Sequence, residues 1–156
     1  MMAEKDRPSA KPIKRYEDIL VYQKCYQLAL EAHRLTINFP NFEKYELGRQ
    51  LRTSSTSIAV NIAEGFSRRS SSADFKRFLA MASGSCGEAK VWISFAKDLD
   101  YVTAEKASEF LQRFDEVGKY CTHCTGIGGS VTKPDFCLTS NFCPLPSGLL
   151  VRQLDE

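Results

Sequence analysis

The stretch from residue 45 to residue 65 carries two stripes of side chains at helical spacing, one apolar and one polar. Steps of three and four residues place side chains on the same face of a helix. The apolar stripe consists of Leu47, Leu51, Ser54, Ile58, Ile62 and Gly65. The polar stripe consists of Gln50, Ser54, Ser57, Asn61 and Glu64. The pattern predicts a helix whose core face borders a row of amide, hydroxyl and carboxylate groups.

Polar groups beside a core either face water or hydrogen-bond to one another, because unpaired burial is unfavourable. A later segment offers Ser85 and Glu88 as partners. We predict a structural polar network between two helices, in which the Asn61 amide donates to Glu88 or Glu64 and accepts from Ser85. Its predicted members are Gln50, Ser57, Asn61, Glu64, Ser85 and Glu88.

Apolar side chains recur at the same spacing in three further stretches, which predicts helices over about 17–38, 72–99 and 104–125. Pro40 ends the first helix, and Asn41 is the predicted N-cap of the second, which runs to about Gly65. Ser71 and Thr103 are the predicted N-caps of the third and fourth. The fold class is all-α, an antiparallel up-down-up-down four-helix bundle.

Gly84 and Gly87 lie inside the third helix, where each costs about 1 kcal/mol relative to alanine. We interpret them as positions where a neighbouring helix, or the side chains of Asn61 and Glu64, comes close to the backbone.

The chain of 156 residues divides into three parts. Residues 1–15 form a flexible arm with five Lys or Arg residues, 16–125 form the bundle, and 126–156 form a Gly- and Pro-containing tail that is extended or disordered. The sequence has no apolar run of a membrane span's length and no signal-peptide pattern at its N-terminus. We therefore expect a cytoplasmic protein with reduced cysteines and no membrane partner.

One combination of short motifs spans both the striped helix and the segment that follows it. The motifs are Phe39-Pro40, Glu43, Tyr45-Glu46-Leu47, Gln50-Leu51-Arg52, Ser57-Ile58, Asn61-Ile62-Ala63-Glu64-Gly65, Gly84-Ser85 and Glu88. Over roughly residues 16–125 the chain resembles the four-helix-bundle proteins encoded in 23S rRNA intervening sequences. The resemblance implies a non-enzymatic helical bundle, typically a homopentamer, with a basic surface. A more distant resemblance to the accessory variability determinant of diversity-generating retroelements implies RNA and a reverse transcriptase as partners.

Basic residues are concentrated between residues 44 and 77, although the net charge of the whole chain is only +2. A solvated charged face is one interpretation, and a phosphate-binding surface, repeated in a ring of identical subunits, is the other. No sequence-reading motif for nucleic acid is present, so binding should be to phosphates. The candidate nucleic-acid-binding residues are Arg49, Arg52, Arg68, Arg69, Lys76 and Arg77.

Catalytic and metal chemistry is weakly supported. Glu64 and Glu88 could form a carboxylate pair, but neither His33 nor His123 has the Glu three residues before it that a di-iron bundle needs. Phosphate-binding loops and zinc-protease motifs are absent from the sequence. The alternative of a zinc site stays open on the four later cysteines, Cys121, Cys124, Cys137 and Cys143. We expect no catalytic residue, no metal and no cofactor.

The sequence therefore predicts a non-catalytic, homo-oligomeric bundle, with a pentamer as the expected form. It would bind RNA or DNA through its basic surface and serve as an accessory to a reverse transcriptase or another nucleic-acid enzyme. The alternative is a protein–protein assembly module that does not bind nucleic acid. The salt dependence of binding separates the two, since phosphate contacts weaken steeply with salt.

Overall fold

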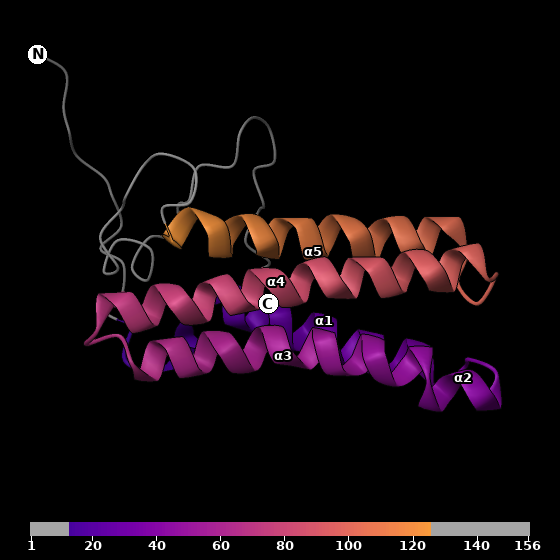
Figure 1. Ribbon diagram of the computed structural model, residues 1–156, viewed down its shortest axis with the longest axis horizontal. Helices are drawn as coiled ribbons and strands as arrows, with labels where there is room; N and C mark the ends of the chain where they lie inside the picture. Colours follow the sequence, from indigo (N-terminus) through magenta and orange to yellow (C-terminus); the bar gives the residue numbers. More distant parts are fainter. Residues whose placement is uncertain (1–12, 126–156) are drawn as a thin grey trace, which may run out of the picture.

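The computed structural model describes residues 13–125, which form an all-helical bundle. Its elements are the 3₁₀ turn η1 (Tyr16–Asp18) and the helices α1 (Leu20–Thr36), α2 (Asn41–Tyr45), α3 (Leu47–Ser67), α4 (Ser72–Asp98) and α5 (Ala104–Thr125). The four long helices alternate in direction along one axis, as Figure 1 shows. The predicted antiparallel four-helix bundle is confirmed. The expectations for residues 1–12 and 126–156 lie outside the described residues.

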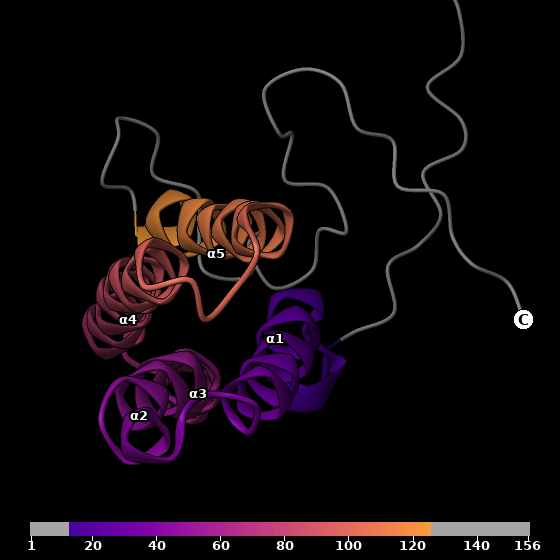
Figure 2. The ribbon, with the colours of Figure 1, turned by 90° about the vertical axis from the view of Figure 1, so that its right-hand side faces the viewer.

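Viewed along the bundle axis, the helices follow one another around the core in the order α1, α3, α4, α5 (Figure 2). α3 packs against both α1 and α4, and α5 packs mainly against α4. The start of α1, the α3–α4 turn and the end of α5 therefore lie at one end of the bundle, with α2 at the other (Figure 1). None of the helices within 13–125 is long and apolar enough to cross a membrane.

The core is built from the predicted stripes. In α3, the side chains of Leu51, Ile58 and Ile62 are at most 2% exposed, and Gly65 is also buried. Rings from α5 complete the centre, where Phe110 and Phe114 are fully buried with centroids 6.2 Å apart. Burial of this apolar surface is the main force that holds the bundle together.

Two of the predicted helix starts are confirmed by hydrogen bonds. Ser71 Oγ accepts from the Asp74 N–H at 3.2 Å, and Thr103 Oγ1 accepts from the Lys106 N–H at 3.3 Å. Between these helices, α4 ends in a turn where Asp100 has a φ of 59°. The Tyr101 N–H donates to the Ala96 carbonyl at 2.8 Å across this turn, the arrangement of a Schellman motif with Asp100 at the left-handed position.

The predicted second helix is interrupted, which the sequence did not indicate. At Glu46 the backbone has φ −101° and ψ −93°, so α2 stops at Tyr45 and α3 starts at Leu47. The predicted N-cap was also wrong, because Pro40 occupies the cap position and no side chain caps α2. Glu43 instead accepts from the Leu47 N–H at 3.4 Å and thereby satisfies a backbone donor at the start of α3.

The interpretation of Gly84 and Gly87 as sites of close packing within the chain is wrong. A Cβ placed on either glycine would have no neighbour within 4 Å among the described residues. Both glycines lie on the outer side of α4, so their small size is not needed to pack this bundle.

Candidate nucleic-acid interface

The six basic residues predicted to bind nucleic acid fall into two groups at opposite ends of α3. Arg49 and Arg52 lie near its start, and Arg68 follows its last residue. The 19 positions from Arg49 to Arg68 correspond to roughly 28 Å of helix at ~1.5 Å per residue. The second group surrounds the α3–α4 turn, and we call it the basic end: Arg68, Arg69, Lys76 and Arg77.

The first group satisfies backbone carbonyls that the break after α2 leaves unpaired. Arg52 Nη2 donates to the Lys44 carbonyl at 2.8 Å, and its Nη1 donates to Thr36 Oγ1 at 2.9 Å. Arg49 Nε donates to the Tyr45 carbonyl at 3.3 Å. Both arginines therefore act as C-terminal caps for α2, and Arg52 in addition ties α3 to α1. We grouped Arg49 and Arg52 with the other cations because they are near them in the sequence. In the structure both side chains instead form hydrogen bonds within the bundle.

At the basic end, three guanidinium groups lie over two buried phenylalanine rings. Arg69 lies 4.0 Å from the centroid of Phe66, and Arg68 and Arg77 lie 5.4 and 5.8 Å from that of Phe78. The rings are 4% and 8% exposed, whereas the three arginines are exposed. Cation–π contact holds each guanidinium in place while its outer face remains open to solvent. Lys76 is half-buried on the first turns of α4.

The α3–α4 turn that carries these cations is tight. The Arg68 N–H donates to the carbonyls of Glu64 and Gly65, both at 3.1 Å. A Cβ at Gly65 would lie 3.1 Å from the Phe78 Cβ, so glycine lets the two helices approach closely just before the turn. Because the turn is short, the cations before and after it are held on one end of the bundle.

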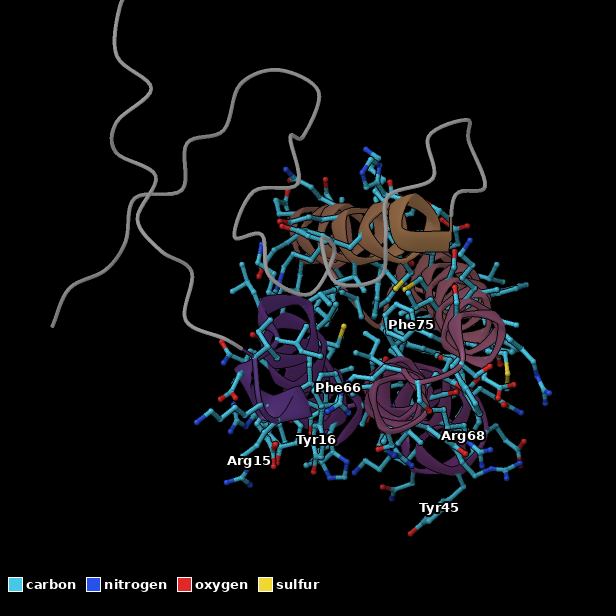
Figure 3. The ribbon with its side chains drawn as sticks, turned by 90° about the vertical axis from the view of Figure 1, so that its left-hand side faces the viewer. Arg15, Tyr16, Tyr45, Phe66, Arg68 and Phe75 are labelled. Atoms are coloured by element: carbon cyan, nitrogen blue, oxygen red, sulfur yellow. The ribbon has the colours of Figure 1, made fainter. Side chains whose placement is uncertain are left out.

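Two further cations lie at the same end of the bundle. η1 packs against α3, and Figure 3, which looks at this end, shows Arg15 and Tyr16 on the same side as Phe66. Arg15 is exposed and pairs with Glu17 at 2.9 Å. Lys14, also exposed, precedes it. The five basic residues of the N-terminal arm were a signal for these two, but the sequence alone did not place them at the same end of the bundle as the α3–α4 turn.

The predicted polar network is smaller than expected. Asn61 Nδ2 donates to the Ser57 carbonyl at 2.8 Å and to its Oγ at 3.0 Å. Ser85 Oγ donates to Ser57 Oγ at 3.0 Å and joins α4 to α3. Asn61 thus bonds within its own helix, one turn back, rather than to Glu64 or Glu88. Gln50 contributes its backbone carbonyl to Ser54 Oγ.

Glu64 and Glu88 do not form a carboxylate pair. Both are exposed: Glu64 lies 3.4 Å from Arg68 Nη2, and Glu88 accepts from the Trp92 indole N–H at 3.2 Å. An acid–base pair would need the two carboxyl groups close together, and these two side chains instead contact Arg68 and Trp92 separately. Their positions give no support to a catalytic site.

Three cysteines, Cys25, Cys86 and Cys121, are buried in the core and free of disulfides. Burial raises the pKa of Cys86 to about 12 and also raises the pKa values of the Cys25 and Cys121 thiols. They remain protonated near neutral pH and behave as core residues. Within the described part of the chain, no cluster of three or more His, Cys, Asp or Glu residues could hold a metal. Cys137 and Cys143 of the alternative zinc site lie outside the described residues.

Several large apolar side chains on α4 and its C-cap, and one on α3, are exposed. We call this group the outer strip, and its side chains are between 46% and 55% exposed: Val60, Met81, Val91, Phe95 and Leu99. Val60 and Met81 lie one helical turn from Ser57 and Ser85, whose hydroxyl groups are hydrogen-bonded at 3.0 Å. The open surfaces of Gly84 and Gly87 also belong to α4. Large apolar side chains grouped on a surface are typical of an interface with another molecule.

The model of one protein family matches residues 17–123, and its description is 23S rRNA-intervening sequence protein. Among solved structures, the chain is similar to a protein of unknown function from the S23 ribosomal protein family of Bacteroides thetaiotaomicron. That likeness has a TM-score of 0.61 at 23% identity and covers 68% of this chain and 98% of the other. No curated protein matches the chain. At this identity the structural likeness supports the fold, and the family match covers the whole bundle; the chain therefore belongs to the 23S rRNA-intervening sequence protein family.

Proposed function

We propose that this protein is a non-catalytic, self-assembling bundle that binds RNA or DNA through the phosphates, using its basic end. The observation that carries the proposal is the arrangement of Arg68, Arg69 and Arg77. Their guanidinium groups lie on the rings of Phe66 and Phe78 rather than in close ion pairs. The nearest such pair, Arg68 with Glu64, has a separation of 3.4 Å and is solvent-exposed, so it offers weak competition to a phosphate.

The geometry suits phosphate rather than sequence recognition. A guanidinium fixed over a ring keeps N–H donors directed outward in a planar fork, which matches the oxygens of a phosphate. Lys14, Arg15 and Lys76 add positive charge at the same end. Arg49 and Arg52 are left out of the proposed interface, since both donate to backbone carbonyls at the other end of the bundle.

Self-assembly is the second part of the proposal. The outer strip exposes about half of each of five large apolar side chains, which favours burial against another subunit. Gly84 and Gly87 on the same helix would let a neighbouring backbone come close. In a closed ring, the basic ends of identical subunits lie at one level, and their positive potentials add. A homopentamer is the form we expect.

The role that we propose for this bundle is that of an accessory, without chemistry of its own. It would hold an RNA or DNA for a reverse transcriptase or another enzyme that acts on nucleic acid.

One observation favours a second candidate, a protein–protein assembly module without nucleic-acid binding. The five side chains of the outer strip are about half exposed, and this apolar surface could accept a helix of a different protein. In that case the arginines at the α3–α4 turn would serve solubility or pair with acidic groups of the partner.

Size-exclusion chromatography with light scattering tests both parts of the proposal. Nuclease-treated protein is measured at low salt, alone and with a structured RNA. An oligomer that becomes heavier with RNA supports the proposal. An oligomer whose mass does not change with RNA favours the assembly module, and a monomer that ignores RNA contradicts both candidates.

A further inference from the structure

A row of three tyrosine rings starts at η1 and runs along α1. The rings of Tyr16 and Tyr22 meet edge to face with centroids 4.9 Å apart. Tyr22 and Tyr26, one helical turn apart, are stacked with centroids 6.1 Å apart and an interplanar angle of 25°. Aromatic contacts of this kind fix the orientation of each ring against the next.

The row is open to solvent at its far end. Tyr26 is 48% exposed, whereas Tyr22 is half-buried and packs on the core. Core packing alone does not account for Tyr26, because Cys25 and Leu28 already fill the buried face of α1. The Tyr22 ring therefore supports one face of the Tyr26 ring, and the other side of Tyr26 is open to solvent.

The other end of the row meets the basic end. Figure 3 shows Tyr16 and Phe66 next to each other, in keeping with the packing of η1 on α3. Arg69 lies on Phe66 at 4.0 Å and donates from Nη1 to the Phe66 carbonyl at 2.9 Å. The tyrosine row and the Arg69–Phe66 contact therefore lie at the same end of the bundle.

The charges at the start of the row cancel, so the positive charge that would attract an anionic ligand comes from the basic end next to it. Arg15 and Lys14 stand at its start, and two carboxylates lie near them. Glu17 pairs with Arg15, and Asp18 accepts from the backbone N–H groups of Lys14 and Arg15 at 3.3 and 3.0 Å. Asp18 and one oxygen of Glu17 are therefore engaged locally, which lowers their repulsion of a phosphate, while Glu17 Oε2 is buried without a hydrogen-bond partner among the described residues.

We propose that this row is a stacking platform for the unpaired bases of a single-stranded nucleic acid whose phosphates lie on the basic end. The inference rests on the proposed function and names its ligand more closely. Single-stranded binding sites combine positive charge along the backbone with aromatic rings for the bases. A duplex cannot use such rings, because its bases already stack on one another. Tyr26 is the ring that an incoming base would contact.

Fluorescence anisotropy with two labelled probes tests the platform. One probe is an unstructured RNA of about 12 nucleotides, and the other has the same phosphates with abasic positions along its length. Four proteins are compared: the wild type, Tyr26→Ala, Tyr26→Phe and Tyr45→Ala. Tyr45 is the matched control, because it is 73% exposed and lies on α2 at the opposite end of the bundle.

We expect Tyr26→Ala to weaken binding of the intact RNA about tenfold, with Tyr26→Phe and Tyr45→Ala close to the wild type. The abasic probe should bind the wild type more weakly and should not distinguish it from Tyr26→Ala. Circular dichroism checks that each variant remains helical.

Two other outcomes overturn the inference in distinguishable ways. Equal binding by Tyr26→Ala and the wild type, together with loss of binding in a variant of the basic end, removes the platform and leaves the proposed function in place. Failure of the wild type to bind either probe or a duplex contradicts the proposed function as well.

Discussion

Arg52 Nη1 donates to Thr36 Oγ1 at 2.9 Å, across the contact between α3 and α1. Thr36 is fully buried and its hydroxyl donates in turn to the His33 carbonyl at 2.9 Å. The second nitrogen of the same guanidinium holds the Lys44 carbonyl at the end of α2. One side chain therefore joins three helices at the point where the chain breaks and restarts.

Arg52→Ala should destabilise the bundle by about 2 kcal/mol, because two hydrogen bonds from a charged donor are lost and a buried hydroxyl loses its donor. Urea denaturation measures the change. Arg49→Ala is the control, since that exposed side chain makes one longer bond, and it should change stability by less than about 0.5 kcal/mol. Equal effects of the two substitutions would contradict the assigned roles.

Asp100→Gly should stabilise the bundle by roughly 0.5–1 kcal/mol. Asp100 has a φ of 59°, a conformation that glycine adopts without steric strain. Thermal melting should show a higher midpoint. Asp98→Gly, placed in the last turn of α4, serves as the control and should give no gain. A lower midpoint for Asp100→Gly would mean that its side chain stabilises the turn.

The sequence predicted the helices well where a local rule decides them. Buried Leu51, Ile58 and Ile62 follow from spacing, and the Ser71 and Thr103 caps follow from residue type. The break at Glu46 was not predicted, because no glycine or proline stands at Glu46 itself, and only the structure shows that Gly48 has no room for a Cβ beside the Glu43 carbonyl, 3.0 Å away. The break is held by contacts between helices, because Arg52 donates both to Thr36 on α1 and to the Lys44 carbonyl at the end of α2.

The candidate nucleic-acid interface was also predictable only where its residues are close in the sequence. Arg68, Arg69 and Arg77 are close in sequence across a short turn, so their grouping was expected and is found. Arg49 and Arg52 are near these residues in the sequence but not in space, since the two groups lie at opposite ends of α3. Asn61 bonds back to Ser57 because that partner is one turn away, whereas the expected carboxylates remain in water.

Stability should fall with acid partly through Glu31. Hydrogen bonding to Arg113, at 2.9 Å from Nη2 to Oε1, holds the pKa of Glu31 below its usual 4.5. A lowered pKa in the folded state adds stability above pH 4.5 that is lost as the pH falls through the folded value. Each side chain is about one-third exposed, so solvent screening limits the contribution to roughly 0.5–1 kcal/mol.

Glu31→Gln should therefore be less stable than the wild type at pH 7 and nearly equal to it at low pH. Urea denaturation at both pH values measures this. Glu88→Gln, which changes an exposed carboxylate on α4, should keep the wild-type difference between the two conditions. A Glu31→Gln variant that follows the wild type at both pH values would exclude this ion pair as a source of acid sensitivity.

Self-assembly should depend on the outer strip. Replacing Val60 and Phe95 together by Glu places charge on two side chains that are 55% and 52% exposed, so folding should be little affected. Light scattering should report a lower mass than for the wild type. Ile37→Glu, at a side chain 54% exposed beyond the end of α1, is the matched control and should assemble normally. Unchanged mass in the double variant would place the interface elsewhere.

The most direct test of the account is the salt dependence of RNA binding at the basic end. Affinity is measured at several salt concentrations for the wild type and for a variant with Arg68, Arg69, Lys76 and Arg77 changed to Gln. A control variant loses the same charge at solvent-accessible positions away from the basic end, through Arg34, Arg49, Lys97 and Lys106 changed to Gln. The account predicts weaker binding and a salt slope shallower by about 3 for the first variant, and near wild-type behaviour for the control. Equal affinity and slope in all three proteins would contradict it.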